Sequence, residues 1–356
     1  MEQAYLILEN GRVFAGRRIG AAGNTVGELV FTTGMVGYLE TLTDPSYAGQ
    51  IVVQTFPLIG NYGVIPGDFE GVCAAKGYVV RELCDTPSNF RSEGALDECL
   101  KQQNIVGICG VDTREITRLL REEGTMNACI CDRVPDELQP VRDYAVTGAV
   151  ASVSCKAPEV FPAEGEKKFS VTLVDYGEKG NIVRCLQRRG CEVTVVPQDT
   201  TAEDILKAQP DGLMLSNGPG DPAENVACVA EIQKLVGKLP IFGICLGHQL
   251  TALAMGGKTV KLKYGHRGGN QPVRDLSGSR TFITSQNHGY AVVAESLKGV
   301  GKEIFRNAND GSCEGMEYPG LRCFTVQFHP EACAGPQDTE FLFDRFIAMM
   351  EVNRHA

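Results

Sequence analysis

The stretch Pro240–Gly257 reads PIFGICLGHQLTALAMGG and organises the C-terminal half of the chain. Its first residues, Pro240–Ile244, form a short apolar run typical of a buried strand, and a helix-like pattern follows Cys245. Gly243 and Gly247 flank this cysteine as in the thiol counterpart of a strand-to-helix nucleophile turn, where Cβ atoms have no room. One cysteine among fourteen is more often a buried structural thiol. Strand, glycines and helix together favour a nucleophile at a helix N-terminus, where peptide dipoles favour a thiolate.

The composition of the 356-residue chain fits a globular protein and argues against several classes of function. The net charge of −10 without a basic tract disfavours a nucleic-acid partner. No apolar run suits a membrane span and the first residues lack a signal-peptide pattern, so we expect a cytoplasmic protein with reduced thiols. No C-x-x-C pair occurs, and Cys129 and Cys131 are expected on opposite faces of a strand. A zinc site there is therefore not expected. We predict no metal site and no cofactor for this chain.

The N-terminal half, residues 1–153, predicts a smaller mixed β/α domain. Ala4–Gly16 has the pattern of a hairpin with its turn at Asn10-Gly11, and Asp112–Glu123 has that of an amphipathic helix. Without a catalytic constellation of its own, this domain is interpreted as a docking or structural unit. Residues 154–168, with two prolines and no apolar period, are predicted to be a linker.

In residues 169–356, strand-like segments alternate with helix-like segments. This alternation predicts an α/β fold, an open and mostly parallel sheet with helices on both faces. Ligands of such sheets bind beyond the carboxyl ends of the strands. The loop Ser216–Asp221 and Cys245 both follow strands in this pattern, so we expect them at the same edge.

A nucleophilic thiol needs a base, and His329 is the best candidate because it follows the strand-like run Cys323–Phe328. Glu331 lies two residues later, where an extended chain puts both side chains on one side, so it can hold the ring tautomer. A solvated loop carboxylate is an equal alternative for Glu331. His266 and His288 lie in apparent glycine-rich loops, where they could contact a ligand.

Acyl transfer also needs donors for an oxyanion. The N–H of Leu246, which follows the nucleophile, is one candidate donor. The amides of Gly218 and Gly220 are others. By itself this loop would more often be a simple tight turn, but its place after a strand at the same edge favours the donor interpretation.

Three motifs of the C-terminal half resemble those of class I glutamine amidotransferase domains, in the same order. They are SNGPGDP at Ser216–Pro222, GICLGHQ at Gly243–Gln249 and TVQFHPE at Thr325–Glu331. Gly27–Tyr47, Asn61–Gly63 and Gly110–Arg114 are similar to segments of the small, glutamine-hydrolysing subunits of carbamoyl-phosphate synthetases. The resemblance covers nearly the whole chain and implies a flavodoxin-like sheet in the C-terminal domain.

The resemblance implies that Cys245 attacks the side-chain amide of glutamine to form a glutamyl thioester, that His329 relays protons and that Glu331 orients it. It also implies a set of positions that hold glutamine: Ser46, Gly218, Gly220, Leu246, Gln249, Asn287, Gly289 and Tyr290. Tyr290 departs from the phenylalanine expected in the family, and a backbone contact there would tolerate the change.

The resemblance further implies a partner, the large subunit of carbamoyl-phosphate synthetase. That subunit is expected to bind ATP and Mg²⁺ and to make carbamoyl phosphate from ammonia and bicarbonate, for arginine and pyrimidine synthesis. This chain has no G-x-x-x-x-G-K-[ST] loop, in agreement with ATP chemistry elsewhere. A natural subunit and a piece of a fused enzyme would look the same.

Two alternatives remain for the function. One is a γ-glutamyl hydrolase or peptidase built on the same turn, which the matches to glutamine-binding positions and the N-terminal half disfavour. The other is a non-catalytic regulatory subunit, which the presence of Cys245, His329 and Glu331 disfavours.

Overall fold

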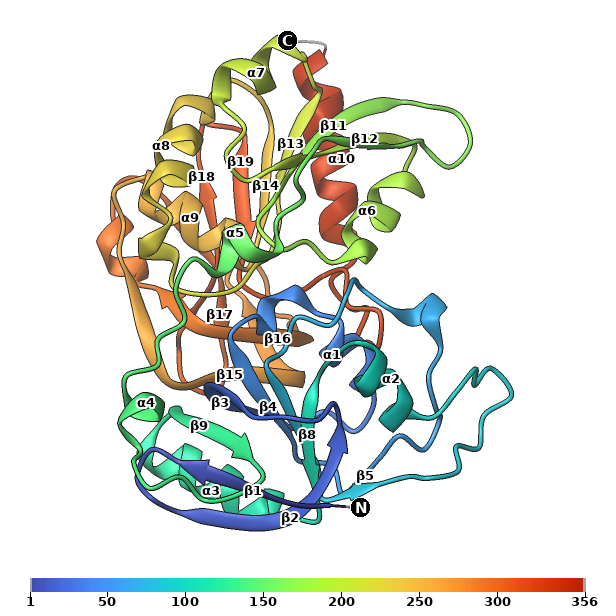
Figure 1. Cartoon of the computed structure of the whole chain (residues 1–356). Coiled ribbons are helices and arrows are strands. Elements are labelled where there is room, and N and C mark those ends of the chain that lie inside the picture. The colour runs from blue at the N-terminus through green and yellow to red at the C-terminus, as the bar shows by residue number, and fades with distance from the viewer. Residues whose placement is uncertain (1, 355–356) are drawn as a thin grey trace. The chain divides into compact units, whose positions relative to one another are not determined.

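The structure is a computed structural model that describes residues 2–354. The chain divides into two compact units, Met1–Ala149 and Val150–Ala356. Each unit has its own sheet (Figure 1) and its own hydrophobic clusters. In the part of the chain that the structure describes, no helix combines the length and the apolar character needed to cross a bilayer.

The N-terminal unit is built on a closed barrel with the strand order β1-β2-β8-β6-β4-β3-β9. Its strands are β1 (Gln3–Leu8), β2 (Val13–Gly20), β3 (Thr25–Thr32), β4 (Gln50–Gln54), β6 (Gly77–Val79), β8 (Val106–Cys109) and β9 (Met126–Cys131), with β5 (Leu58–Ile59) and β7 (Glu82–Leu83) paired beside it. Its helices are α1 (Tyr38–Leu42), α2 (Leu96–Gln102), α3 (Thr113–Glu123) and α4 (Gln139–Arg142).

Local sequence signals account for much of this unit. The predicted hairpin is confirmed, since β1 and β2 pair antiparallel and Gly11 turns the chain with φ 91°. The predicted helix is also confirmed, as α3. The Asp112 side chain caps this helix by accepting from the N–H groups of Arg114 and Glu115. Ile116 and Leu120 are fully buried on the apolar face of this helix.

The prediction for Cys129 and Cys131 is wrong. Both lie on β9 and their sulfur atoms are 4.0 Å apart. Residues two apart on a strand share a face, because only successive side chains alternate. All fourteen cysteines are free thiols.

The C-terminal unit contains a ten-stranded sheet in the order β10-β12-β11-β13-β14-β19-β18-β16-β15-β17. The strands are β10 (Glu159–Phe161), β11 (Phe169–Asp175), β12 (Cys191–Pro197), β13 (Gly212–Leu215), β14 (Ile241–Ile244), β15 (Thr259–Asp275), β16 (Thr281–Val292), β17 (Lys302–Asn307), β18 (Cys313–Tyr318) and β19 (Cys323–Val326). The helices are α5 (Ala149–Val153), α6 (Gly180–Gln187), α7 (Ala202–Lys207), α8 (Val226–Leu235), α9 (Leu246–Ala254) and α10 (Phe341–Arg354).

The α/β class is confirmed, but the sheet is mixed. Strands β12, β11, β13, β14 and β19 are parallel, whereas β10 and the strands from β18 onward pair antiparallel. The long strands β15 and β16 form a bent antiparallel pair with register shifts, where the sequence analysis expected glycine-rich loops around His266 and His288. Part of the predicted linker, β10, adds an edge strand because it pairs with β12.

Helices cover both faces of the parallel strands. On one face α6 and α10 bury an apolar cluster that includes Phe242, Phe343 and Phe346, and on the other face α7, α8 and α9 bury a second cluster (Figure 1). The Phe242 ring is fully buried and stacks on Phe324, with ring centroids 4.4 Å apart. The two clusters hold the carboxyl ends of β13, β14 and β19 at one edge.

At that edge the first turn of α9 is in direct contact with β13. A Cβ on Gly247 would lie 2.4 Å from the Leu215 carbonyl oxygen, and the Gly247 N–H donates to the Ser216 carbonyl at 3.0 Å. A Cβ on Gly243 would meet the Gly247 carbonyl at 3.0 Å. Both glycines are therefore required by contact, as the sequence pattern predicted.

We expect Gly247→Ala to lower the free energy of unfolding by about 1–3 kcal/mol, because the methyl group collides with backbone that cannot move away. Thermal unfolding followed by circular dichroism measures the change. Gly278→Ala is the matched control, since a Cβ there meets only the Asp275 carboxylate at 3.4 Å. Equal stability of the two variants would contradict the tight contact at Gly247.

Candidate active site

Cys245 occupies the sharp turn between β14 and α9. Its backbone has φ 52° and ψ −100°, outside the helical and extended regions, and such strain persists only where the surroundings impose it. Its N–H donates to the Val326 carbonyl at 2.8 Å, which continues the parallel sheet up to the turn. The side chain is 2% exposed, and its thiol donates to the Asn287 carbonyl at 3.7 Å.

His329 and Glu331 lie together, three to five residues beyond the end of β19. The His329 N–H donates to the Ser285 carbonyl at 2.9 Å, which fixes the chain at this point. The ring Nδ1 lies 2.6 Å from Glu331 Oε1, and both side chains are fully buried. Because a carboxylate only accepts, it holds the proton on Nδ1 and turns Nε2 outward from the pair. The surface-loop alternative for Glu331 is wrong.

The charges in this group shift both pKa values. Burial and the charge of Lys179 lower the pKa of the His329 ring. The charge of Glu331, a polar contact with the Cys245 thiol and the hydrogen bond to the carboxylate outweigh them and raise that pKa to about 9. Burial raises the pKa of Glu331, but the charges of His329 and Lys179 lower it to about 2. Nε2 of His329 makes no hydrogen bond of standard geometry, so the thiol contact is a loose one.

Sequence reasoning missed two residues that hold Glu331. Lys179 Nζ lies 3.4 Å from Glu331 Oε1, and the Asn181 side-chain amide donates to the Glu331 backbone carbonyl. Both follow the Asp175-Tyr176-Gly177 turn after β11. The signal was available, because that turn falls at the same carboxyl edge as the loop after β13.

The predicted glutamine-binding positions divide by location. Leu246 is the first residue of α9, where N–H groups have no partner within the helix. Gly218 and Gly220 lie in the loop after β13, and a Cβ on Gly218 would be 2.3 Å from the Tyr176 carbonyl oxygen. Ser46 belongs to the N-terminal unit, so its part in the site remains a prediction.

The other predicted positions lie on β16 or contact it. The Gln249 amide donates to the Tyr290 carbonyl at 2.8 Å and to Gln327 Oε1 at 2.9 Å. Asn287 supplies the carbonyl that accepts from the Cys245 thiol, and Gly289 lies between Asn287 and Tyr290 in sequence. The structure thus brings the sulfur, Gln249 and this segment of β16 together.

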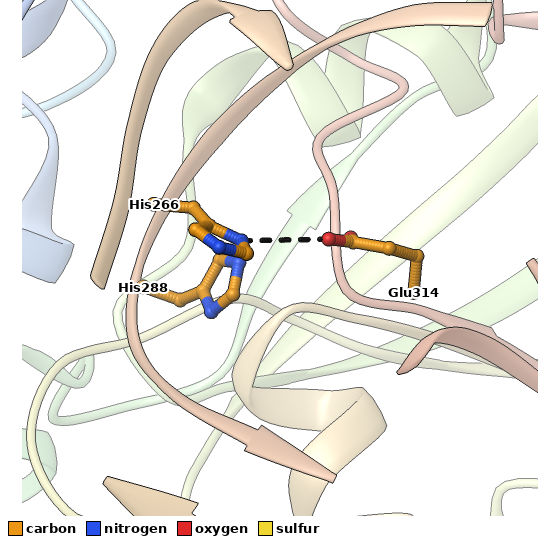
Figure 2. Close-up of side chains that lie close together, drawn as sticks. All are labelled: His266, His288 and Glu314. Carbon is orange, nitrogen blue, oxygen red and sulfur yellow. Dashed lines mark ion pairs between the residues drawn. The ribbon is translucent and has the colours of Figure 1, made fainter. Parts of the chain in front are cut away.

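The histidines that were expected in loops lie on strands. Figure 2 shows His266 of β15 and His288 of β16 near Glu314 of β18, a group whose donor atoms lie within 4.8 Å of one another and could hold a metal ion. Each ring nitrogen already faces an oxygen: His266 faces Asp310 at 2.9 Å and Glu314 at 3.5 Å, and His288 faces the Tyr290 carbonyl at 2.7 Å and Gln286 at 3.1 Å. A metal would have to displace these contacts, so we interpret the group as a polar network.

The remaining histidine of this region is structural. His248, in the first turn of α9, is completely buried, and its Nδ1 lies 2.7 Å from the Thr325 hydroxyl. Burial lowers the pKa of His248 to about 3, so the ring is neutral.

Two family models match the chain. The model described as carbamoyl-phosphate synthase small chain, CPSase domain, matches residues 6–130, and that of glutamine amidotransferase class-I matches residues 172–349. A carbamoyl phosphate synthase small chain of Fusobacterium nucleatum is 52% identical over 359 residues, covering 99% of each chain. One of Bacillus cereus is 50% identical, covering 97% of this chain and 95% of the relative. A carbamoyl phosphate synthase pyrimidine-specific small chain of Halalkalibacterium halodurans is 50% identical, covering 98% of each. With the two domain models matched in order and half of the residues identical over nearly the full length, the chain belongs to the carbamoyl phosphate synthase small-chain family.

Proposed function

We propose that this chain hydrolyses glutamine to glutamate and ammonia, and that a large subunit uses the ammonia to make carbamoyl phosphate from bicarbonate and ATP. The observation that supports this best is the 2.6 Å bond between His329 and Glu331 beside a strained cysteine. An intact and buried dyad next to a nucleophile turn also argues against a regulatory subunit without activity.

Charge balance supports a thiolate as the nucleophile. Buried His329, Glu331 and Lys179 carry two positive charges and one negative charge when His329 is protonated. A buried net charge is costly, and a Cys245 thiolate brings the sum to zero. The pair that reacts is a thiolate beside an imidazolium.

The chemistry follows from this pair. The thiolate attacks the side-chain carbonyl carbon of glutamine, and N–H groups of the oxyanion site stabilise the charge that develops on the oxygen. The carbon–nitrogen bond breaks as His329 gives its proton to the leaving nitrogen, which departs as ammonia. Water then loses a proton to His329 and attacks the glutamyl thioester, which releases glutamate and restores the thiolate.

The glutamine site that we propose comprises Ser46, Gly218, Gly220, Leu246, Gln249, Asn287, Gly289 and Tyr290. Tyr290 contributes its backbone carbonyl, which accepts from Gln249 and faces His288. A tyrosine in place of the expected phenylalanine leaves this contact intact. We propose a cytoplasmic heteromeric enzyme in arginine and pyrimidine synthesis, with ATP and Mg²⁺ bound by the large subunit.

Glutamate release from glutamine is expected to be slow for the chain alone and fast in the complex with its large subunit. The reason is that, in a coupled amidotransferase, the cysteine reacts rapidly with glutamine only when the large subunit is ready to use the ammonia. Steady-state glutamate formation, measured with and without the large subunit, tests this. Equal rates in the two assays would contradict coupling.

Cys245→Ser is expected to abolish glutamine-dependent synthesis and to leave synthesis from free ammonia unchanged in the complex, because only the sulfur performs amide cleavage. Carbamoyl phosphate formation from each nitrogen source measures the effect. Cys155→Ser, at a half-buried thiol of the same unit, is the control that retains both activities. Loss of both activities in the Cys245 variant would mean that the cysteine is structural.

Glu331→Gln is expected to reduce kcat by about 10²–10⁴-fold, because the ring loses its orienting partner. The alkaline side of the pH profile of the residual activity should also move to lower pH. The charge of Glu331 is the largest contribution that raises the pKa of His329, so removing it lowers the pH at which His329 loses the proton that the leaving ammonia needs. A pH profile of glutamate formation measures both effects.

The matched control for this profile is Glu340→Gln, which removes a carboxylate paired with Arg188 and Arg189 at the surface. It should leave the rate and the profile unchanged. An alkaline limit that stays in place in Glu331→Gln would exclude the His329 proton as its cause.

A further inference from the structure

Glu314 is a carboxylate with no exposed surface on β18, and its partners are amide groups. Its Oε1 accepts from the Asn307 side-chain amide at 2.9 Å, and its Oε2 accepts from the Gln286 amide at 3.0 Å. His266 forms an ion pair with Oε1 at 3.5 Å (Figure 2). Each amide donates an N–H to a different oxygen of Glu314, and a carboxylate offers two accepting oxygens where a carboxamide offers one.

These contacts continue from Glu314 to the backbone of β16. The Gln286 amide also donates to the Thr284 hydroxyl oxygen at 3.1 Å, which fixes its orientation and turns its oxygen toward His288. That oxygen lies 3.1 Å from His288 Nε2. The opposite ring nitrogen, Nδ1, donates to the Tyr290 carbonyl at 2.7 Å. A neutral ring has only one N–H, so Nε2 and the Gln286 oxygen are in contact without a hydrogen bond. Glu314 therefore acts on this segment through the side chain of Gln286, the residue that directly precedes Asn287 on β16.

The segment that this network holds, Asn287–Tyr290, lies at the reactive sulfur. The Asn287 carbonyl accepts from the Cys245 thiol, and the Tyr290 carbonyl accepts from Gln249 as well as from His288. Burial lowers the pKa of His288 well below its usual value, so the ring orients its neighbours without supplying a proton to the reaction.

We propose that Glu314 is a positioning residue that fixes the segment Asn287–Tyr290 for binding of glutamine. This proposal rests on the proposed glutaminase function, and it concerns binding of substrate rather than the chemical step. Glu314 has no contact with Cys245, His329 or Glu331 among the described interactions, so its removal should affect KM and not kcat.

The first test is Glu314→Gln, which has the same shape but only one acceptor oxygen. One of the two amides then faces an N–H group, and the network loses a buried hydrogen bond. We expect the KM for glutamine to rise about tenfold, with kcat changed by less than about twofold. Glutamate formation by the complex with the large subunit measures both, and synthesis from free ammonia should be unchanged.

The second test restores the network by moving the carboxylate. The double variant combines Asn307→Asp with Glu314→Gln. The carboxylate at position 307 then accepts from the side-chain amide at position 314, and the oxygen of that amide still accepts from Gln286. The negative charge stays near His266, because Asn307 Nδ2 already lies 3.5 Å from its Nδ1. We expect the KM to return to within about twofold of the original value.

The control is Glu317→Gln, three residues along the same strand, which removes a carboxylate that pairs with Arg345 at the surface. It should leave KM and kcat unchanged. A KM that is unchanged in Glu314→Gln, or a loss of kcat that the double variant does not recover, would overturn the proposal.

If Glu314→Gln does not fold, the double variant decides, since the proposal predicts a near-normal KM when the carboxylate is at 307 and a raised KM there would overturn it. Failure of this proposal is separable from failure of the proposed function, because the unaltered complex would still form glutamate from glutamine. Absence of glutamate formation by that complex would instead refute the function.

Discussion

The close contact between the first turn of α9 and the end of β13 is the constraint on which the site depends. It leaves space for no side chain at Gly247 and forces Cys245 into a conformation that non-glycine residues avoid. The strain is supported by two apolar clusters, one on each face of the parallel strands. A rigid core thus keeps the sulfur at the carboxyl edge of the parallel strands.

The second requirement is a balance of buried charge. His329 is protonated at neutral pH only because Glu331 and the thiol outweigh burial and the charge of Lys179. Lys179 lowers the pKa of both members of the pair, so it keeps Glu331 ionised while it limits the basicity of His329. Without Lys179, His329 and Glu331 would keep their hydrogen bond, but the pKa values of both groups would be higher.

The sequence alone was sufficient to predict features that depend only on neighbouring residues. The turn around Cys245, the hairpin at Gly11 and the cap of α3 each depend on residues within one short segment, and all three are present. The dyad of His329 and Glu331 was accessible for the same reason, because its members are two residues apart.

Where the arrangement depends on distant segments, sequence reasoning failed or had no means to succeed. The bend of β15 against β16 results from register shifts between the two strands. No local sequence pattern predicts such shifts, so the sequence analysis placed His266 and His288 in loops. Lys179 approaches Glu331 across 152 positions of the chain, and its role depends on an edge rule that identifies a region but not a residue. The cysteines of β9 show a different failure, in which the period of a strand was misapplied.

The site is therefore supported from two independent directions. From the parallel strands come the nucleophile turn and the charged pair, whose positions are fixed by apolar packing and by main-chain hydrogen bonds. From the antiparallel extension comes the segment Asn287–Tyr290. The hydrogen bond between Gln286 and Glu314 fixes its start, and the His288 ring contacts the Tyr290 carbonyl at its end. Polar networks of this kind specify direction as well as distance, because each donor needs an acceptor in one place. The groups of the proposed chemical step and the segment that we propose to bind glutamine are therefore held by separate sets of contacts.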